Sequence, residues 1–537
     1  MIEIKSMSKS ETGSWIRRPL AWGFLAAGIG VAAFVPLYHG LTRFYLANSD
    51  QDIDLTYQAL IFNAGYGVPY HPHTGYGYAI LLAPWLTLAH QFGLIDTAGI
   101  DALIGSPRFD ELYLQIIAAG RALSIVYAIA ATAIFGLVAW MCCGNGLIAS
   151  IAAFLFGTSL GLGYQSSVLR TELPSMLAIL VSFSLVLFAA RNMGWRGVIA
   201  LGLSAFAVVF GCLIKVQAVI VSTFLPVVPF LFARYSNSPA PSPRAIGIFS
   251  LASAAVGVIG LYRWATALAM GSTWTYQIAA LALLVGFVVV YSFLYARSSL
   301  WVIPALSAIA AGAGAGASLV YISDHWWTLF GITNFIEFTA HNRHSSVGEG
   351  TASLVSAVVS LGAREMATLW LEFHGGPRNY PLQLLIWLAG AGAFYLMLKW
   401  EWRSAIKITF FLAFPLILIL IFSVRGYAYY YQIYTEPFFI LAGSICATEL
   451  SARWERRRII VIVAYAMLAL FIGGATLRFR LVAPSTGITR DARHACCAMD
   501  YATLIAEHFR PYCAQATEAC PLNWTALPAM LDTFLKR

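Results

Sequence analysis

The sequence predicts an all-α polytopic membrane protein with about thirteen transmembrane helices. Three observations predict this fold class: a hydrophobic composition, long apolar runs, and an uneven placement of Lys and Arg between the runs. Of the 537 residues, 60% are hydrophobic and 11% are charged, whereas soluble domains carry about 25% charged residues. At least a dozen runs are long enough to cross a bilayer core of about 30 Å. The composition excludes a soluble enzyme and a nucleic-acid-binding protein.

The first apolar run extends from Leu20 to Leu41 and follows a cationic segment that includes Arg17 and Arg18. It is too long for a signal peptide and has no obvious small-residue cleavage site. Because Lys and Arg are enriched in cytoplasmic loops, we expect a first span with the N-terminus in the cytoplasm.

Twelve further apolar runs predict the remaining spans. They lie near residues 117–141, 146–163, 173–190, 197–212, 217–233, 245–262, 274–296, 300–322, 382–398, 407–424, 436–450 and 459–476.

One more apolar run, residues 76–95, is not expected to cross the membrane. It contains Pro84, Trp85 and His90, and such residues suit an interfacial or re-entrant helix. With this run outside the bilayer, the cytoplasmic loops hold sixteen Lys and Arg residues, and the outer loops up to residue 476 hold nine. This ratio agrees with the positive-inside rule.

This topology predicts two regions. Residues 1–476 would form a transmembrane domain with long outer loops at 42–116 and 323–381, and residues 477–537 would form a small periplasmic tail. The expected location is the bacterial inner membrane, with the C-terminus in the periplasm.

The predicted tail holds four cysteines, Cys496, Cys497, Cys513 and Cys520. In an oxidising compartment, four cysteines allow three disulfide pairings. Zinc binding together with His494 is the alternative, although the spacing matches no common zinc pattern.

Three carboxylates alternate at the start of the first outer loop, at Asp50, Asp52 and Asp54. If a helix starts here, Asp50 and Asp54 share a face and Asp52 lies on the opposite side. These residues could act chemically or could form an acidic helix start.

The same loop carries His71 and His73. These two histidines could act as acid and base or could face water. They could also bind a divalent metal with Asp52 or Asp54 as a further ligand. No cofactor is required by the sequence, and metal dependence stays open.

Cations gather at the same predicted membrane face as these carboxylates. Arg121 and Lys215 lie at the ends of apolar runs, and Arg425 begins a tyrosine-rich segment. Arg170 and Glu172 flank a turn at this face. Charged residues close to spans are costly and are usually functional.

This combination suits chemistry on a lipid-linked phosphosugar. Arg and Lys can hold the phosphate and stabilise it as it leaves, and a carboxylate can take the proton from an acceptor hydroxyl. The sugar or acceptor could be bound by His71, His73, Arg170, Tyr429 and Tyr430.

The chain resembles the GT-C superfamily of polyprenyl-phosphate-sugar-dependent glycosyltransferases, which includes lipid A aminoarabinose transferases and protein O-mannosyltransferases. The resemblance covers residues 20–476 and rests on an ordered set of segments. These are DQDIDLTYQALIFNAGYG (51–67), HTGYGYAILLAPWLTLAHQFG (73–93), AAGRALSIVYAI (118–129), SSVLRTELPSMLAILVSFSLVLFAA (166–190), GCLIKVQAVIV (211–221) and RGYAYYYQIYTEPFFILAG (425–443).

The resemblance implies a GT-C-like bundle and an inverting sugar transfer. Asp52 or Asp54 would be the general base. Arg121, Lys215 and Arg425 would contact the donor phosphate, and Glu172 with Arg170 would shape the site. The usual adjacent acidic pair is replaced here by D-x-D, and the tail matches no large soluble domain.

The implied partners are a polyprenyl-phosphate-linked sugar, membrane lipids, and a glycan, lipid or protein acceptor. Two alternatives stay open: a ligase that uses a diphosphate-linked oligosaccharide, and a transporter or flippase of lipid-linked sugars. Transporters place ionisable groups near the bilayer midplane, whereas these groups lie near one face.

Overall fold

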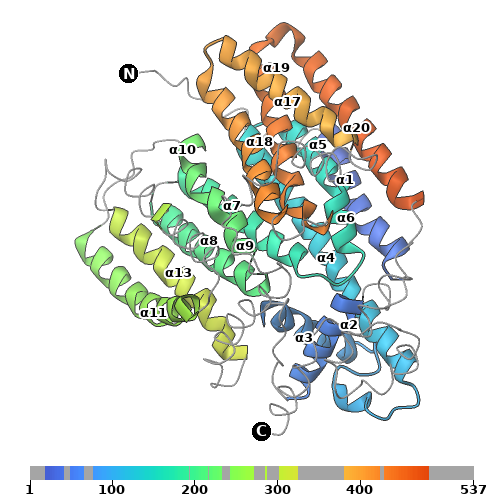
Figure 1. Ribbon diagram of the computed structural model, residues 1–537. Coiled ribbons are helices and arrows are strands. Elements are labelled where there is room, and N and C mark those ends of the chain that lie inside the picture. The colour runs from blue at the N-terminus through green and yellow to red at the C-terminus, as the bar shows by residue number, and fades with distance from the viewer. Residues whose placement is uncertain are drawn as a thin grey trace, which may run out of the picture. The chain divides into compact units, whose positions relative to one another are not determined.

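The computed structural model describes residues 19–41, 49–65, 76–192, 194–215, 217–232, 242–270, 285–286, 301–323, 380–423 and 429–482. Throughout these segments the chain forms helices and the turns between them, and no β-strand occurs (Figure 1). The all-α prediction is confirmed for this part of the chain.

The helices follow one another in this order: α1 (Pro19–His39), α2 (Ser49–Asn63), α3 (Tyr76–Gln91), η2 (Ile100–Ala102), α4 (Phe109–Cys143), α5 (Gly146–Gly157), α6 (Leu160–Ser166), α7 (Glu172–Arg191), α8 (Trp195–Ile214), α9 (Ala218–Val221), η3 (Ser222–Val227), α10 (Val228–Phe232), α11 (Pro243–Met270), α13 (Val302–Ser323), α17 (Tyr380–Leu398), α18 (Trp402–Ser423), η6 (Tyr429–Tyr434), α19 (Glu436–Arg453), η7 (Glu455–Arg457) and α20 (Arg458–Val482).

Seven helices in the described segments are long and apolar enough to cross a membrane, which identifies a multi-pass membrane protein. The predicted total of thirteen stays a prediction, because runs such as 274–296 fall largely outside the described residues. The seven are Pro19–Tyr38, Phe109–Cys143, Glu172–Arg191, Trp195–Ile214, Pro381–Leu398, Trp402–Ile419 and Glu455–Leu481.

Two predicted spans differ from single straight helices. The run 146–163 forms α5 and α6, which meet at a 54° bend. The run 217–233 divides into α9, η3 and α10. Pro226 lies inside η3, and Pro229 lies inside α10. Proline lacks the backbone N–H that continues a helix, so this run forms short pieces.

The chain divides into two compact units that interleave along the sequence. The first comprises residues 1–34, 128–163 and 352–482, and the second comprises 35–127, 164–351 and 483–537. The predicted boundary at residue 476 differs from this division, and α20 continues to Val482. Most of the outer loop 323–381 and all four tail cysteines lie outside the described residues.

In the first unit, α17, α18, α19 and α20 lie side by side, and α5 packs against α19 and α20 (Figure 1). Aromatic side chains fill part of this bundle: the rings of Phe414 and Phe438 are 5.0 Å apart. The α19 helix is buried along most of its length, which places it at the centre of the unit.

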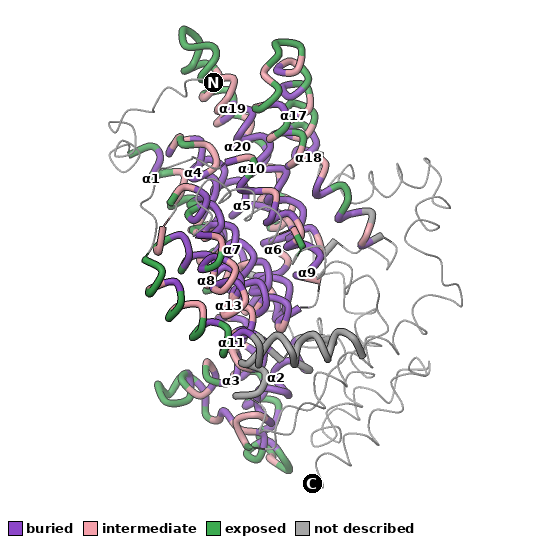
Figure 2. The backbone as a smooth tube through the Cα atoms, turned by 90° about the vertical axis from the view of Figure 1, so that its left-hand side faces the viewer, coloured by how far each residue is buried: buried purple, intermediate pink, exposed green. Residues whose placement is uncertain are grey.

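In the second unit, α7, α8, α13 and α11 pack in that order. The small residues at 311–317 lie on α13, and a Cβ atom at Gly312 would clash with the carbonyl oxygen of Gly202 on α8. The two backbones therefore touch, as expected for small residues between membrane helices. Exposed residues lie along the described part of α11 (Figure 2), and they include the apolar Ile248 and Leu251. These side chains suit contact with lipid.

The described part of the first loop, which is predicted to lie outside, packs around its own apolar core. Side chains of α2, α3, η2 and the start of α4 form this core, with Leu60, Leu82 and Tyr113 fully buried. The α3 helix has 16 residues and is therefore about 24 Å long. It is shorter than the bilayer core of about 30 Å, so an interfacial position suits it.

Candidate functional site

A buried ion pair joins the first loop to the membrane helices of the second unit. Arg121 on α4 donates through Nη2 to Oδ2 of Asp52 on α2 at 2.6 Å, and the two side chains are 2% and 0% exposed. The other carboxylate oxygen, Oδ1, accepts the backbone N–H of Leu169 at 2.7 Å. Arg121 Nη1 also donates to the carbonyl of Gly40 at 2.8 Å. The pair thus fixes four chain segments to one another.

The local structure explains why Asp52 points inward. The helix begins at Ser49, so the condition under which Asp52 lies on the opposite side from Asp50 and Asp54 is met. Ile53 on one side of Asp52 is fully buried. The Tyr113 hydroxyl donates to the carbonyl of Ile53 at 3.0 Å and lies 2.9 Å from Oγ1 of Thr56. These bonds hold the α2 face that carries Asp52 against α4.

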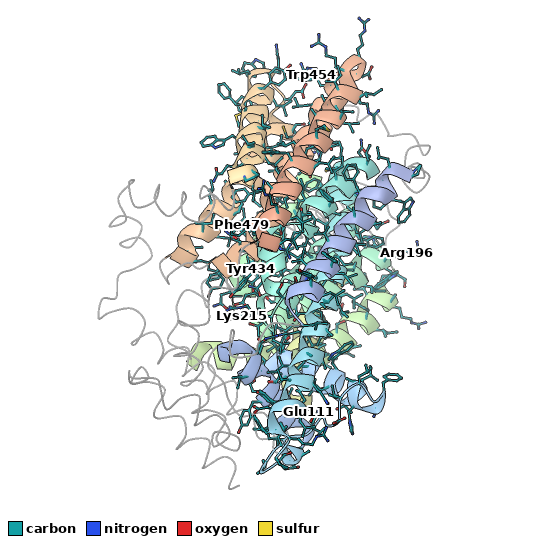
Figure 3. All side chains as sticks on the ribbon, turned by 90° about the vertical axis from the view of Figure 1, so that its right-hand side faces the viewer. Glu111, Arg196, Lys215, Tyr434, Trp454 and Phe479 are labelled. Atoms are coloured by element: carbon teal, nitrogen blue, oxygen red, sulfur yellow. The ribbon has the colours of Figure 1, made fainter. Side chains whose placement is uncertain are left out.

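A second buried ion pair lies where α7 begins and α8 ends. Glu172 is the first residue of α7, and Lys215 follows the last residue of α8. Lys215 Nζ is 3.2 Å from Oε1 of Glu172, and the side chains are 8% and 1% exposed. An acid at a helix start and a cation at a helix end are each stabilised by the helix dipole. Figure 3 shows Lys215, at the end of α8 opposite Arg196.

Arg170 adds a third cation next to the second pair. Its guanidinium lies 5.2 Å from the centroid of the Tyr164 ring, and Nη2 is 3.4 Å from the Tyr164 hydroxyl. It also attracts the Glu172 carboxylate electrostatically. The aromatic face holds this guanidinium through a cation–π contact.

Tyr78 on α3 is a buried tyrosine that senses the carboxylates of both ion pairs. Its hydroxyl is buried and lies within electrostatic range of both Asp52 and Glu172. Burial raises the pKa of Tyr78 well above its ordinary value, and Tyr127 and the two carboxylates raise the pKa further. Tyr78 therefore remains a neutral hydroxyl that can donate one hydrogen bond.

The buried charges of the second unit coincide with the predicted site. In the described part of this unit, the buried charged residues are Asp52, Arg121, Arg170, Glu172 and Lys215, and each is a predicted site residue. Three are cations and two are carboxylates, so the group carries one surplus positive charge. A surplus charge in a low-dielectric setting favours an anionic ligand.

Several predicted residues fall outside what the structure describes. His71, His73 and Arg425 lie in undescribed segments, and the side chain of Asp54 on α2 is undescribed. The same holds for the side chains of Tyr429 and Tyr430 at the start of η6. Their roles stay predictions.

The sequence offers Asp52, Asp54, His71 and His73 as ligands for a divalent metal. Within the described segments, no cluster of three His, Cys, Asp or Glu side chains is arranged to hold a metal ion. Both oxygens of Asp52 already accept bonds. The metal hypothesis now depends on the undescribed residues.

The sequence analysis missed a polar cluster in the first unit. Glu436 begins α19 and is 1% exposed, and its Oε2 accepts the backbone N–H of Gly161 at 2.9 Å. Arg480 on α20 donates to the carbonyl of Ser159 at 3.2 Å, beside the α5–α6 bend. Glu436 is a carboxylate within an otherwise apolar segment, and this pattern could have indicated the cluster from the sequence.

No protein-family model matches the sequence, and no curated protein is significantly similar to it. The functional interpretation of the site therefore depends on its residues and their geometry.

Proposed function

We propose that this protein is a GT-C-type membrane glycosyltransferase. It moves a sugar from a polyprenyl-monophosphate-linked donor to an acceptor at the periplasmic face. The observation that carries this proposal is the group of five buried charges in the second unit, with its surplus of one cation.

The charge of the donor fits this group. A polyprenyl-phosphate sugar is a phosphodiester with one negative charge, and the polyprenyl phosphate that leaves carries more. Lys215 and Arg170 are the cations nearest Glu172, and they stabilise the negative charge that develops on the phosphate. Because Glu172 orients Lys215, we assign Glu172 a positioning role.

Asp54 is the general base in this proposal, and Asp52 is a structural residue. A general base must reach the proton that it takes. Asp52 is fully buried, and both its oxygens accept bonds from Arg121 and Leu169. Helix positions advance by about 100° per residue, so position 54 lies about 200° around α2 from position 52. We therefore assign the D-x-D motif one structural acid, Asp52, and one catalytic acid, Asp54.

The reaction then proceeds by inversion. The acceptor hydroxyl oxygen attacks the anomeric carbon on the face opposite the phosphate, and its proton passes to Asp54. The bond between the anomeric carbon and the phosphate oxygen breaks, and both bonding electrons remain on the phosphate. Lys215 and Arg170 hold that phosphate until the lipid leaves.

Mass spectrometry of envelope glycans, lipids and proteins tests the proposal. Cells that express the wild-type chain should contain a sugar-modified product that is absent with Asp54→Asn. Asp101→Asn, an exposed acid in the same loop, is the matched control and should leave the product intact. A product that persists with Asp54→Asn at wild-type level would refute the assignment of the base.

Two further measurements separate the alternatives. Binding of a polyprenyl-monophosphate sugar, but not of its diphosphate counterpart, supports the proposed donor. The opposite preference would identify a ligase. Uptake of a lipid-linked sugar into liposomes without a covalent product would identify a transporter or flippase.

A further inference from the structure

In the first unit, two helical turns form one surface. The α17–α18 turn and the α19–α20 turn are joined by side chains: Arg453 forms an ion pair with Glu401, and the rings of Tyr395 and Trp454 are 5.9 Å apart in an edge-to-face arrangement. Nearby, Lys407 Nζ lies 3.6 Å from Oε1 of Glu449. We call residues 395–407 and 449–458 the paired-turn surface. Figure 3 shows Trp454 at the end of α19 away from Tyr434.

The paired-turn surface is strongly cationic. It carries seven Lys and Arg residues and three Glu residues, which leaves a surplus of four positive charges. Two of the three acids are already paired with cations of the surface. The most exposed cations include Arg403 and the run Arg456–Arg458. The surface is therefore complementary to an anionic partner.

Exposed tryptophans accompany these cations. Trp400 is 79% exposed, Trp402 is 49% exposed and Trp454 is 41% exposed. Indole rings prefer the interface between membrane and water, where the ring meets lipid and the N–H meets polar headgroups. Three exposed indoles beside a cationic cluster point to a lipid headgroup as the partner.

Trp400 has an unusual backbone. The N–H of Glu401 bonds to the carbonyl of Leu396, and the N–H of Trp400 bonds to the carbonyl of Met397, which is a Schellman motif with Trp400 at the left-handed position. Its φ is 62°. A bulky residue is strained there, and glycine usually takes this place.

The chain builds the same motif with glycine at the end of α3. There the backbone N–H of Leu94 donates to the carbonyl of Ala89, and the N–H of Gly93 donates to the carbonyl of His90. Gly93 has a φ of 67°. Within the chain, the Trp400 ring makes an edge-to-face contact with the ring of Trp402, 6.1 Å away, and Trp400 is still 79% exposed. A contact with a lipid headgroup would help to offset the cost of the left-handed backbone at Trp400.

We propose that the paired-turn surface binds anionic phospholipid headgroups in the cytoplasmic leaflet. Arg456, Arg457 and Arg403 contact the lipid phosphates, and Trp400 inserts at the level of the headgroups. The positive-inside rule predicts that these turns face the cytoplasm, and anionic lipids attract polybasic segments there. This inference is independent of the proposed sugar transfer.

Native mass spectrometry of the full chain in detergent tests the lipid site. The probes are cardiolipin, phosphatidylglycerol and phosphatidylcholine with the same acyl chains. We expect the wild-type chain to retain both anionic lipids at least about tenfold more than phosphatidylcholine. Arg456→Gln/Arg457→Gln should remove most of this preference. Arg196→Gln/Arg244→Gln, which neutralises two exposed cations of other predicted cytoplasmic loops, is the matched control and should preserve it.

Trp400→Gly separates lipid binding from a structural role. Glycine suits a φ of 62°, so the Tm in detergent should stay the same or rise, while retention of cardiolipin falls about threefold. Equal retention of all three lipids by the wild-type chain would overturn the proposal. So would an equal loss of preference in the two Arg double variants, or unchanged cardiolipin retention in Trp400→Gly.

Discussion

The two compact units of this protein differ in how many charged side chains they bury. The described part of the second unit buries five charged side chains, which lie near the start of α2, within α4, at the start of α7 and at the end of α8. In the first unit, the described buried charge is Glu436, and the cations of the paired-turn surface lie at exposed or half-exposed positions.

This difference separates two uses of charge in a membrane protein. Burial of an ion costs several kcal/mol, which pairing repays only where the geometry is good, so a cluster of buried charges calls for a functional explanation. Exposed cations at helix ends cost little and can set topology or bind lipid headgroups. The comparison predicts that substitutions in the two units have different consequences.

The largest effect is expected at Asp54. Removal of a general base lowers the rate by about 10²–10⁴-fold, so Asp54→Asn should reduce sugar transfer by this factor while the Tm stays near the wild-type value. The measurement is product formation by purified protein, with Asp101→Asn as the control. A drop in Tm with loss of transfer would instead indicate a folding role.

Asp52→Asn should show the opposite pattern. It leaves the buried guanidinium of Arg121 without its carboxylate, and breaking a buried pair costs about 3–5 kcal/mol. We expect a large loss of thermal stability, measured by thermal unfolding in detergent. The double variant Asp52→Asn/Arg121→Gln removes both charges and should recover part of that loss. Additive losses in the double variant would contradict a direct pairing.

Much of the fold could be predicted from hydropathy. The predicted runs 173–190 and 197–212 lie within α7 and α8, and 382–398 lies within α17. The helix at Ser49–Asn63 could be predicted from its acidic start. The bend between α5 and α6 could not, because no proline or charge marks residues 158 and 159.

The five buried charged residues of the second unit were all named from the sequence, but their pairing was not. Residue types and positions at span ends indicated Arg121, Glu172 and Lys215. The partner of Arg121 could not be found this way, since Asp52 is 69 residues away and the D-x-D pattern does not say which acid faces inward. The sequence also gave no sign of the Schellman motif at Trp400, because glycine is absent there.

The next largest effect is expected at Lys215. Loss of one group that stabilises developing charge typically lowers the rate by about 10²–10³-fold, so Lys215→Met should reduce transfer by this factor. Lys215→Arg keeps the charge beside Glu172 and should lose less. Single-turnover kinetics measures both variants. If Met and Arg reduce the rate equally, the shape of Lys215 rather than its charge is required.

A smaller effect is expected for Glu436→Gln, which probes the buried acid of the first unit. A hydrogen bond to a charged group contributes about 1.5–3 kcal/mol, and glutamine still offers an oxygen to the Gly161 N–H. We expect a stability loss at or below that range and normal transfer per folded molecule. A loss of transfer in fully folded Glu436→Gln would show that the first unit also takes part in the chemistry.

The smallest effect is expected at Arg108, which lies in the same predicted loop as Asp52 and Asp54 but is exposed. Its Nη2 lies 2.9 Å from Oδ2 of Asp96 and 2.7 Å from Oε1 of Glu111. All three side chains are at least half exposed. Hydrogen bonds to these acids raise the pKa of Arg108, so it remains charged at every practical pH. Water and salt screen such pairs strongly. Arg108→Gln should change neither the Tm nor the transfer rate measurably, at low or high salt. A clear effect would mean that exposed charges of the second unit also serve its function, and the contrast between buried and exposed charge would no longer identify the site.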